Sequence, residues 1–104
     1  MELGISVDPK PERYLISVSG EVDISCADRL KEAIDAAAEQ PVEEVCLDFS
    51  QVAYIDSTGI GVLVATARRL GEGSKRFSVV NVQPNVMRVI QLLGVDKEMD
   101  ISAA

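Results

Sequence analysis

Hydrophobic positions near the N-terminus follow a period of two. Apolar residues alternate with other residues over 3–7 and again over 14–18, which predicts two strands. The turn-forming stretch Asp-Pro-Lys-Pro at residues 8–11 separates them, so we expect an antiparallel hairpin. Gly20 is expected to close the second strand.

Three later segments follow the helical period instead, over 25–40, 60–70 and 84–93. The first begins at Ser25, with Asp28 at the spacing of a capping box. Proline or glycine ends each segment, at Pro41, at Gly71 and Gly73, and at Gly94. The apolar stripes are Leu30, Ala33, Ile34 and Ala37; Ile60, Leu63, Val64, Ala67 and Leu70; and Val86, Val89, Ile90 and Leu93. Pro84 fits the first turn of the third helix.

Continuous apolar runs lie between these helical segments and predict buried strands. Residues 45–47, extended by Phe49 and by 52–55, are typical of a strand covered on both faces. A further strand is expected over 77–82, and 99–102 is compatible with a short strand or a tail. Strand–helix–strand units of this length demand parallel pairing. We therefore expect a single α/β domain over 1–104, with a mixed, mostly parallel sheet and the order β-β-α-β-α-β-α.

Composition excludes several classes of function. The chain has no His, so a Ser-His-Asp triad cannot be built and zinc sites lose their commonest nitrogen ligand. A net charge of −7 argues against a nucleic-acid binder, which needs a basic patch. No apolar run reaches the ~20 residues of a membrane span, and no secretory signal is visible. We expect a cytoplasmic protein without direct membrane insertion, metal or cofactor.

The two cysteines and the charge distribution leave alternatives open. Cys26 and Cys46 lie 20 residues apart, which favours small buried residues over a disulfide or redox pair. Residues 1–56 hold 13 acidic and 4 basic side chains, whereas 57–104 hold 4 and 6. Both a polar face offered to a basic partner and ordinary solvated helix faces fit this asymmetry.

The most informative stretch is the strand-to-helix turn at Asp56. Ser57 and Thr58 follow at the start of the helix, and Gly59 and Gly61 lie just inside it. Glycine costs about 1 kcal/mol relative to alanine in a helix, so these two glycines predict either a close approach of another group to the backbone or tight packing of the helix on the sheet. Free N–H groups and the helix dipole also favour an anion here, such as a phosphate on Ser57. The alternative is that Ser57 or Thr58 only caps the helix.

This turn lacks the features of common enzyme sites. No Gly-Lys-Ser/Thr follows the glycines, which excludes a P-loop, and Gly59-Ile60-Gly61 is only half of a dinucleotide fingerprint. A nucleophilic serine would need a base, and neither His nor a nearby Lys supplies one. A two-component receiver domain needs a Lys after a late strand, whereas Gln83 and Pro84 follow the strand at 77–82. We therefore expect no enzymatic activity.

Four segments match a known pattern in order and spacing. They are G-E-V-D-I at 20–24, L-D-F-S-Q-V-A-Y-I-D-S-T-G-I-G-V-L at 47–63, F-S-V-V-N-V-Q-P-N-V at 77–86 and L-L-G-V-D-K at 92–97. Together they cover nearly the whole chain and resemble bacterial anti-sigma factor antagonists, which belong to the STAS domain family. The resemblance implies a single STAS-type domain.

The same resemblance implies a switch between binding partners. In such proteins an anti-sigma factor, which is an ATP-dependent serine kinase, phosphorylates the serine after the Asp. The unmodified antagonist binds this kinase and frees the sigma factor, the phosphorylated form does not bind, and a metal-dependent serine phosphatase restores it. Carried over, the phosphoacceptor is Ser57, and Thr58 is a less favoured acceptor. The matching residues of the docking surface and of the turn that presents the serine are Asp23, Asp56, Gly59 and Gly61.

The resemblance leaves a second partner surface and a second function open. Ser25, Asp28 and the polar face of the first helix are candidate partner contacts, or simply solvated. Similar domains also occur beside anion and lipid transporters, so the alternative function is a stand-alone accessory subunit of a membrane transporter or lipid-transport ATPase complex. The intact Asp-Ser-Thr-Gly favours the switch, because a pure scaffold needs no hydroxyl there.

Overall fold

One sheet organises the part of the chain that the computed structural model describes, residues 3–9 and 13–103. Its five strands lie in the order β1-β2-β3-β4-β5. The strands are β1 (Gly4–Pro9), β2 (Arg13–Val22), β3 (Glu44–Ile55), β4 (Arg76–Val82) and β5 (Asp100–Ala103). The helices are α1 (Ala27–Ala38), α2 (Ser57–Glu72), α3 (Pro84–Leu92) and the short 3₁₀ helix η1 (Val95–Lys97).

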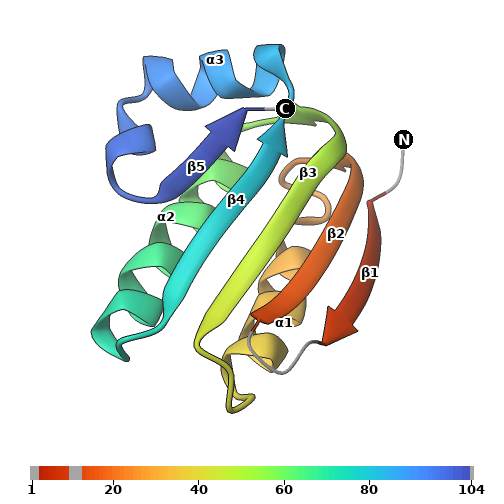
Figure 1. The fold of residues 1–104 in the computed structure, drawn as a ribbon. Coiled ribbons are helices and arrows are strands. Elements are labelled where there is room, and N and C mark those ends of the chain that lie inside the picture. The colour runs from red at the N-terminus through yellow and green to blue at the C-terminus, as the bar shows by residue number, and fades with distance from the viewer. Residues whose placement is uncertain (1–2, 10–12, 104) are drawn as a thin grey trace.

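The pairing of the strands confirms the predicted mixed sheet. β1 and β2 are antiparallel, and each later neighbour is parallel to the one before it. A helix connects each parallel pair, because the chain must return to the end of the sheet where it started. α1 and α2 cover one face of the sheet, and α3 lies across the end at which β3 and β4 finish (Figure 1). Residues 10 and 11 of the predicted turn at 8–11 lie outside the described residues.

The core lies between the helices and the face of the sheet that they cover. Burying apolar surface contributes about 25 cal/mol per Å², so the largest buried side chains hold the two layers together. These side chains include Ile16, Leu30, Ile34, Leu47, Phe49, Leu63 and Ile90. Among the described residues, no helix combines the length and apolar character needed to span a membrane.

The central strand β3 is buried along its apolar run, as predicted. Val45, Cys46 and Leu47 each expose none of their surface. Helices α1 and α2 cover one face of the sheet (Figure 1), and Val45 and Leu47 share the core cluster with residues of these helices. Cys46 points to the opposite face of the strand and lies in register between Leu15 of β2 and Ser78 of β4. Neighbouring side chains, instead of a second helical layer, therefore bury this side of the strand.

β2 runs past Gly20, so the prediction that Gly20 closes the strand is wrong. The residue has φ 97°, which glycine adopts without strain, and the register with β3 shifts between Gly20 and Glu21. Gly20 thus forms a bulge within the strand. The continuation pairs Val22 with Ile55, so β2 and β3 end side by side.

The later element boundaries also refine the predictions. α2 continues through Gly71 to Glu72, and Gly73 is its C-cap. Leu93 lies just beyond α3 and is 54% exposed, so its predicted place in the buried stripe is wrong. Gly94 has φ 73° and ends this helical region as predicted. The last segment is a strand, β5, parallel to β4.

Candidate functional site

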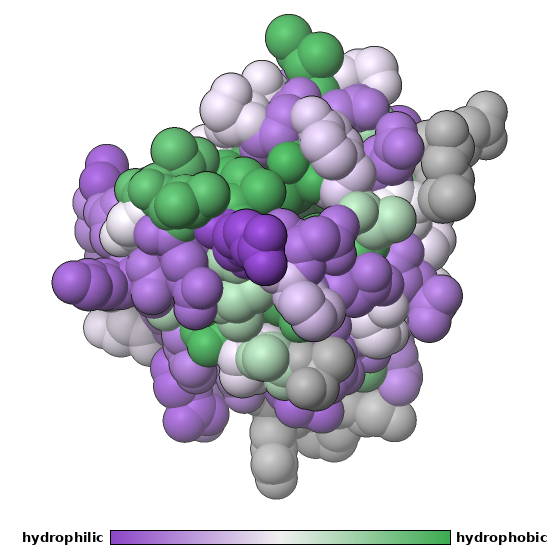
Figure 2. All heavy atoms as spheres, turned by 90° about the horizontal axis from the view of Figure 1, so that it is seen from above, coloured by the Kyte–Doolittle hydropathy of each residue, from purple (hydrophilic) through white to green (hydrophobic). Residues whose placement is uncertain are grey.

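The predicted site residues gather where β2 and β3 end. Val22 and Ile55 are paired in register, so Asp23 and Asp56 follow neighbouring strand ends. The backbone N–H of Asp56 donates to the carbonyl of Val22 at 3.1 Å, which fixes the two chain exits against each other. Parallel strands carry their following loops to the same edge of the sheet, and this edge faces the viewer in Figure 2.

Asp56 holds two segments with one side chain. Its Oδ1 accepts from the backbone N–H of Gly59 at 2.9 Å, and its Oδ2 accepts from that of Ile24 at 3.0 Å. The first bond makes Asp56 the N-cap of α2. The second ties the loop between β2 and α1 to the same turn. The alternative in which Ser57 or Thr58 caps the helix is therefore wrong.

Capping by Asp56 leaves Ser57 free at the start of α2. Ser57 is the first residue of the helix and is exposed. Among the described residues, none forms a hydrogen bond with its hydroxyl. The site thus presents a serine hydroxyl that no structural role occupies.

Asp23 organises the loop that leads into α1. Its Oδ1 accepts from the backbone N–H of Ser25 at 3.0 Å and from the Ser25 hydroxyl at 2.6 Å. The Cys26 thiol also donates to this oxygen. The bond from the Ser25 hydroxyl, followed by the bond from the Cys26 thiol, holds the pKa of Asp23 below its ordinary value of 3.8. Ser25 therefore does not begin the helix as predicted: α1 starts at Ala27, and its N-cap Cys26 makes no side-chain capping bond.

The two glycines of α2 have different surroundings. A Cβ on Gly59 would lie 2.7 Å from both Val22 Cγ1 and the Val22 carbonyl oxygen. Tight packing of the helix on the sheet is therefore confirmed at Gly59, where α2 lies against the end of β2. A Cβ on Gly61 would meet nothing within 4 Å, so the tight packing is not found there.

Sequence reasoning missed Ile24, which is 76% exposed between Asp23 and Ser25. The sequence carries a weak signal for it, since this apolar residue lies after Gly20, the predicted end of the strand, and before the helical stripe. Asp28 is exposed on the first turn of α1. The two cysteines are free and buried, as expected of small buried residues.

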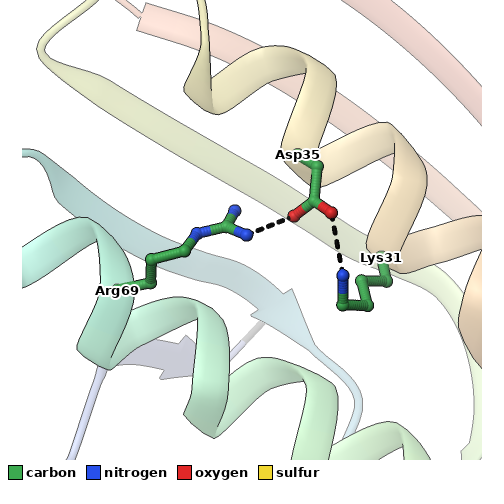
Figure 3. A network of polar contacts seen from close by, with 3 residues as sticks. All are labelled: Lys31, Asp35 and Arg69. Atoms are coloured by element: carbon green, nitrogen blue, oxygen red, sulfur yellow. Dashed lines mark hydrogen bonds and ion pairs between the residues drawn. The ribbon is translucent and has the colours of Figure 1, made fainter.

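A groove of about 470 Å³ between α1 and α2 begins beside this turn. Thr58 and Gly61 line it, and three charged residues lie along its wall. Asp35 of α1 accepts from Lys31 Nζ at 2.9 Å and pairs with Arg69 Nη1 of α2 at 2.6 Å (Figure 3). The hydrogen bond from Lys31 is the largest cause that lowers the pKa of Asp35 below 3.8. The network thus bridges the two helices.

Replacing Asp35 by asparagine is expected to lower the free energy of unfolding by about 0.5 kcal/mol at pH 7, because partly exposed ion pairs contribute little. The folded-state pKa of Asp35 lies below the unfolded value of 3.8, so its contribution is present above that value. It is lost as the pH falls through the folded-state pKa. Urea unfolding of both proteins at pH 7 and pH 3 checks this. Glu32→Gln, an exposed change on the same helix, should alter neither value, and an equal Asp35→Asn effect at both pH values contradicts the assignment.

Comparison with known proteins gives a consistent result. The family model described as "Mlab, STAS domain" matches residues 5–101. The anti-sigma-B factor antagonist of Staphylococcus aureus (strain NCTC 8325 / PS 47) is 24% identical over 102 residues, covering 98% of this chain and 94% of the relative. An anti-sigma factor antagonist from Mycobacterium paratuberculosis superposes with a TM-score of 0.88 at 31% identity, covering 99% of this chain and 87% of that one. The phosphorylated form of SpoIIAA from Bacillus shares the fold, with a TM-score of 0.72 at 23% identity, covering 94% of this chain and 90% of that one.

Proposed function

The chain belongs to the STAS domain family, and we propose that it is an anti-sigma factor antagonist switched by phosphorylation of Ser57. In its unmodified form it binds an anti-sigma factor serine kinase and thereby releases the sigma factor. Phosphorylation by that kinase blocks binding, and a metal-dependent serine phosphatase restores the unmodified form. The chain is then a ligand and substrate of the kinase in the bacterial cytoplasm.

The exposed hydroxyl of Ser57 is the single observation that carries this proposal. A kinase must reach the acceptor oxygen, and Asp56 performs the capping that would otherwise engage it. Thr58 is also exposed, but it lines the groove between α1 and α2. The resemblance to anti-sigma factor antagonists places the acceptor directly after Asp56, so Ser57 is the favoured acceptor.

The physical effect of a phosphate at Ser57 supports the loss of binding. The modification adds roughly −1.5 to −2 to the net charge of −7. This charge falls beside Asp56, on the side of the molecule that also holds Asp23. A partner that covers the surface must desolvate the dianion, which costs several kcal/mol when no basic pair meets it. Because every 1.4 kcal/mol changes affinity tenfold, such a cost is enough to separate the two forms.

Incubation with the candidate anti-sigma kinase tests the proposal directly. With ATP, intact mass is expected to show one added phosphate; with ADP, gel filtration is expected to show a stable complex. The isolated phosphorylated form should then fail to form that complex. If the phosphorylated form binds as well as the unmodified one, the switch is wrong. Co-purification with a membrane transporter, unaffected by Ser57→Asp, would instead support the accessory-subunit function.

A further inference from the structure

Ile24 is an exposed apolar side chain next to the phosphoacceptor turn. It exposes 76% of its surface. A single exposed hydrophobic residue needs no explanation, since much of any protein surface is apolar. The feature that distinguishes Ile24 is the way its backbone is held. Leu92 is 79% exposed, but it lies at the end of α3, and among the described residues its backbone does not bond to this turn.

The loop that carries Ile24 is fixed on both sides. The N–H of Ile24 donates to Asp56 Oδ2 at 3.0 Å, across 32 positions of the chain. The preceding residue, Asp23, accepts from the backbone and hydroxyl of Ser25 through its side chain and from Cys26 and Ala27 through its carbonyl. An apolar group on a backbone fixed in this way loses little conformational freedom when a partner covers it. Ile24 is thus preorganised for contact.

The charges around Ile24 indicate the chemistry of its partner. Asp23 and Asp56 flank it through the loop and the turn, and no basic side chain bonds to either carboxylate in the described part of the chain. In Figure 2 hydrophobic residues at this end lie among hydrophilic ones. A complementary surface would offer an apolar pocket with Lys or Arg at its rim.

We propose that Ile24 is a docking anchor that enters an apolar, basic-rimmed pocket of the anti-sigma factor kinase, and that Asp56 positions it relative to Ser57. This inference rests on the proposed function, because the kinase is the occupant. It also deepens that function. The carboxylate that holds Ile24 belongs to the residue directly before Ser57, so a phosphate there repels the group that positions the anchor.

Truncating the anchor is the first test. Ile24→Ala is expected to weaken binding of the unmodified protein to the kinase at least tenfold, as hot-spot truncations do, measured by calorimetry with ADP present. The thermal midpoint should stay unchanged, because the side chain is exposed. Val7→Ala is the matched control, because Val7 is also an exposed apolar residue, at 42%. It lies on β1 opposite Ile16, which is about 20 Å along β2 from Val22 and so far from the site. Equal affinities of the Ile24→Ala and wild-type proteins would overturn the anchor.

Asp56→Asn tests the positioning role without removing the helix cap. Asparagine retains one acceptor oxygen, enough to cap Gly59, but its NH₂ group cannot accept from Ile24. The amide of Ile24 is expected to exchange with solvent at least tenfold faster in NMR, while that of Ser25, held by Asp23, keeps its rate. Affinity for the kinase should fall at least tenfold, whereas the loss of one exposed hydrogen bond should lower the thermal midpoint by only about 4–8 °C. Unchanged Ile24 exchange, or faster exchange with full affinity, would overturn the positioning role.

The outcomes separate this inference from the proposed function. If wild type binds the kinase and loses binding on phosphorylation, but Ile24→Ala binds equally well, the switch stands and the anchor is wrong. If wild type never binds any candidate kinase, the proposed function fails and the anchor fails with it. If no kinase is bound, faster exchange of the Ile24 amide in the Asp56→Asn protein would show only that Asp56 holds the Ile24 backbone, with no role in docking.

Discussion

Replacing Gly59 by alanine is expected to destabilise the protein by about 2–3 kcal/mol, as overpacking of a close contact does. The added Cβ would lie 2.7 Å from the Val22 carbonyl oxygen, a backbone atom that cannot rotate away. A third contact, 2.9 Å from Ile55 Cγ1, blocks a shift toward β3. Alanine gains about 1 kcal/mol of helix propensity, which offsets only part of this cost. Urea unfolding followed by circular dichroism measures the difference.

Gly61→Ala is the matched control for this substitution. It lies two residues along the same helix, and its added Cβ meets nothing within 4 Å. The substitution then changes only the helix propensity, which favours alanine over glycine. The variant should therefore be as stable as wild type or up to about 1 kcal/mol more stable. Equal stability of the two alanine variants would mean that α2 does not depend on its close approach to β2.

The predictable part of the fold is the part that periodicity encodes. The alternation at 14–18, the apolar run at 45–47 and the stripe at 60–70 each identified an element, and the connecting helices required parallel strands. Gly20 shows the limit of this approach. In the sequence, a glycine that ends a strand looks the same as a glycine that forms a β-bulge within it. Only the pairing of β2 with β3 distinguishes the two cases.

The sequence predicted where the site lies, whereas the hydrogen bonds within the site could be identified only from the folded structure. Sequence spacing offered Ser25 as the start of the first helix and Ser57 or Thr58 as the cap of the second. In the structure Asp56 caps α2, and Asp23 accepts from the N–H of Ser25 in the loop before α1. Each aspartate directly follows a strand end. The bond from Ile24 to Asp56 joins residues 32 positions apart, and no local pattern encodes it. The serine that local reasoning assigned to capping is consequently free.

Ser57→Ala is expected to abolish phosphate incorporation by the cognate kinase, reducing it at least 100-fold in an intact-mass assay. The Ser57 hydroxyl bonds to no described residue, and Asp56 still caps α2, so the free energy of unfolding should change by less than about 0.5 kcal/mol. Binding to the kinase should persist, because the variant resembles the unmodified form. Thr58→Ala is the control and should accept one phosphate as wild type does. Phosphorylation of Ser57→Ala at the wild-type rate, or its loss in Thr58→Ala, would contradict the assignment.

Ser57→Asp separates the effect of charge on binding from its effect on folding. A negative charge in the first turn interacts favourably with the helix dipole, by about 0.3–1 kcal/mol at an exposed position. Repulsion from the neighbouring Asp56 opposes this, so stability should change little. Affinity for the kinase should nevertheless fall at least tenfold, because the docked partner must desolvate the new charge. A variant that is stably folded but does not bind would place the switch in the docking surface itself, and one that binds fully would show that charge at residue 57 is not what the kinase rejects.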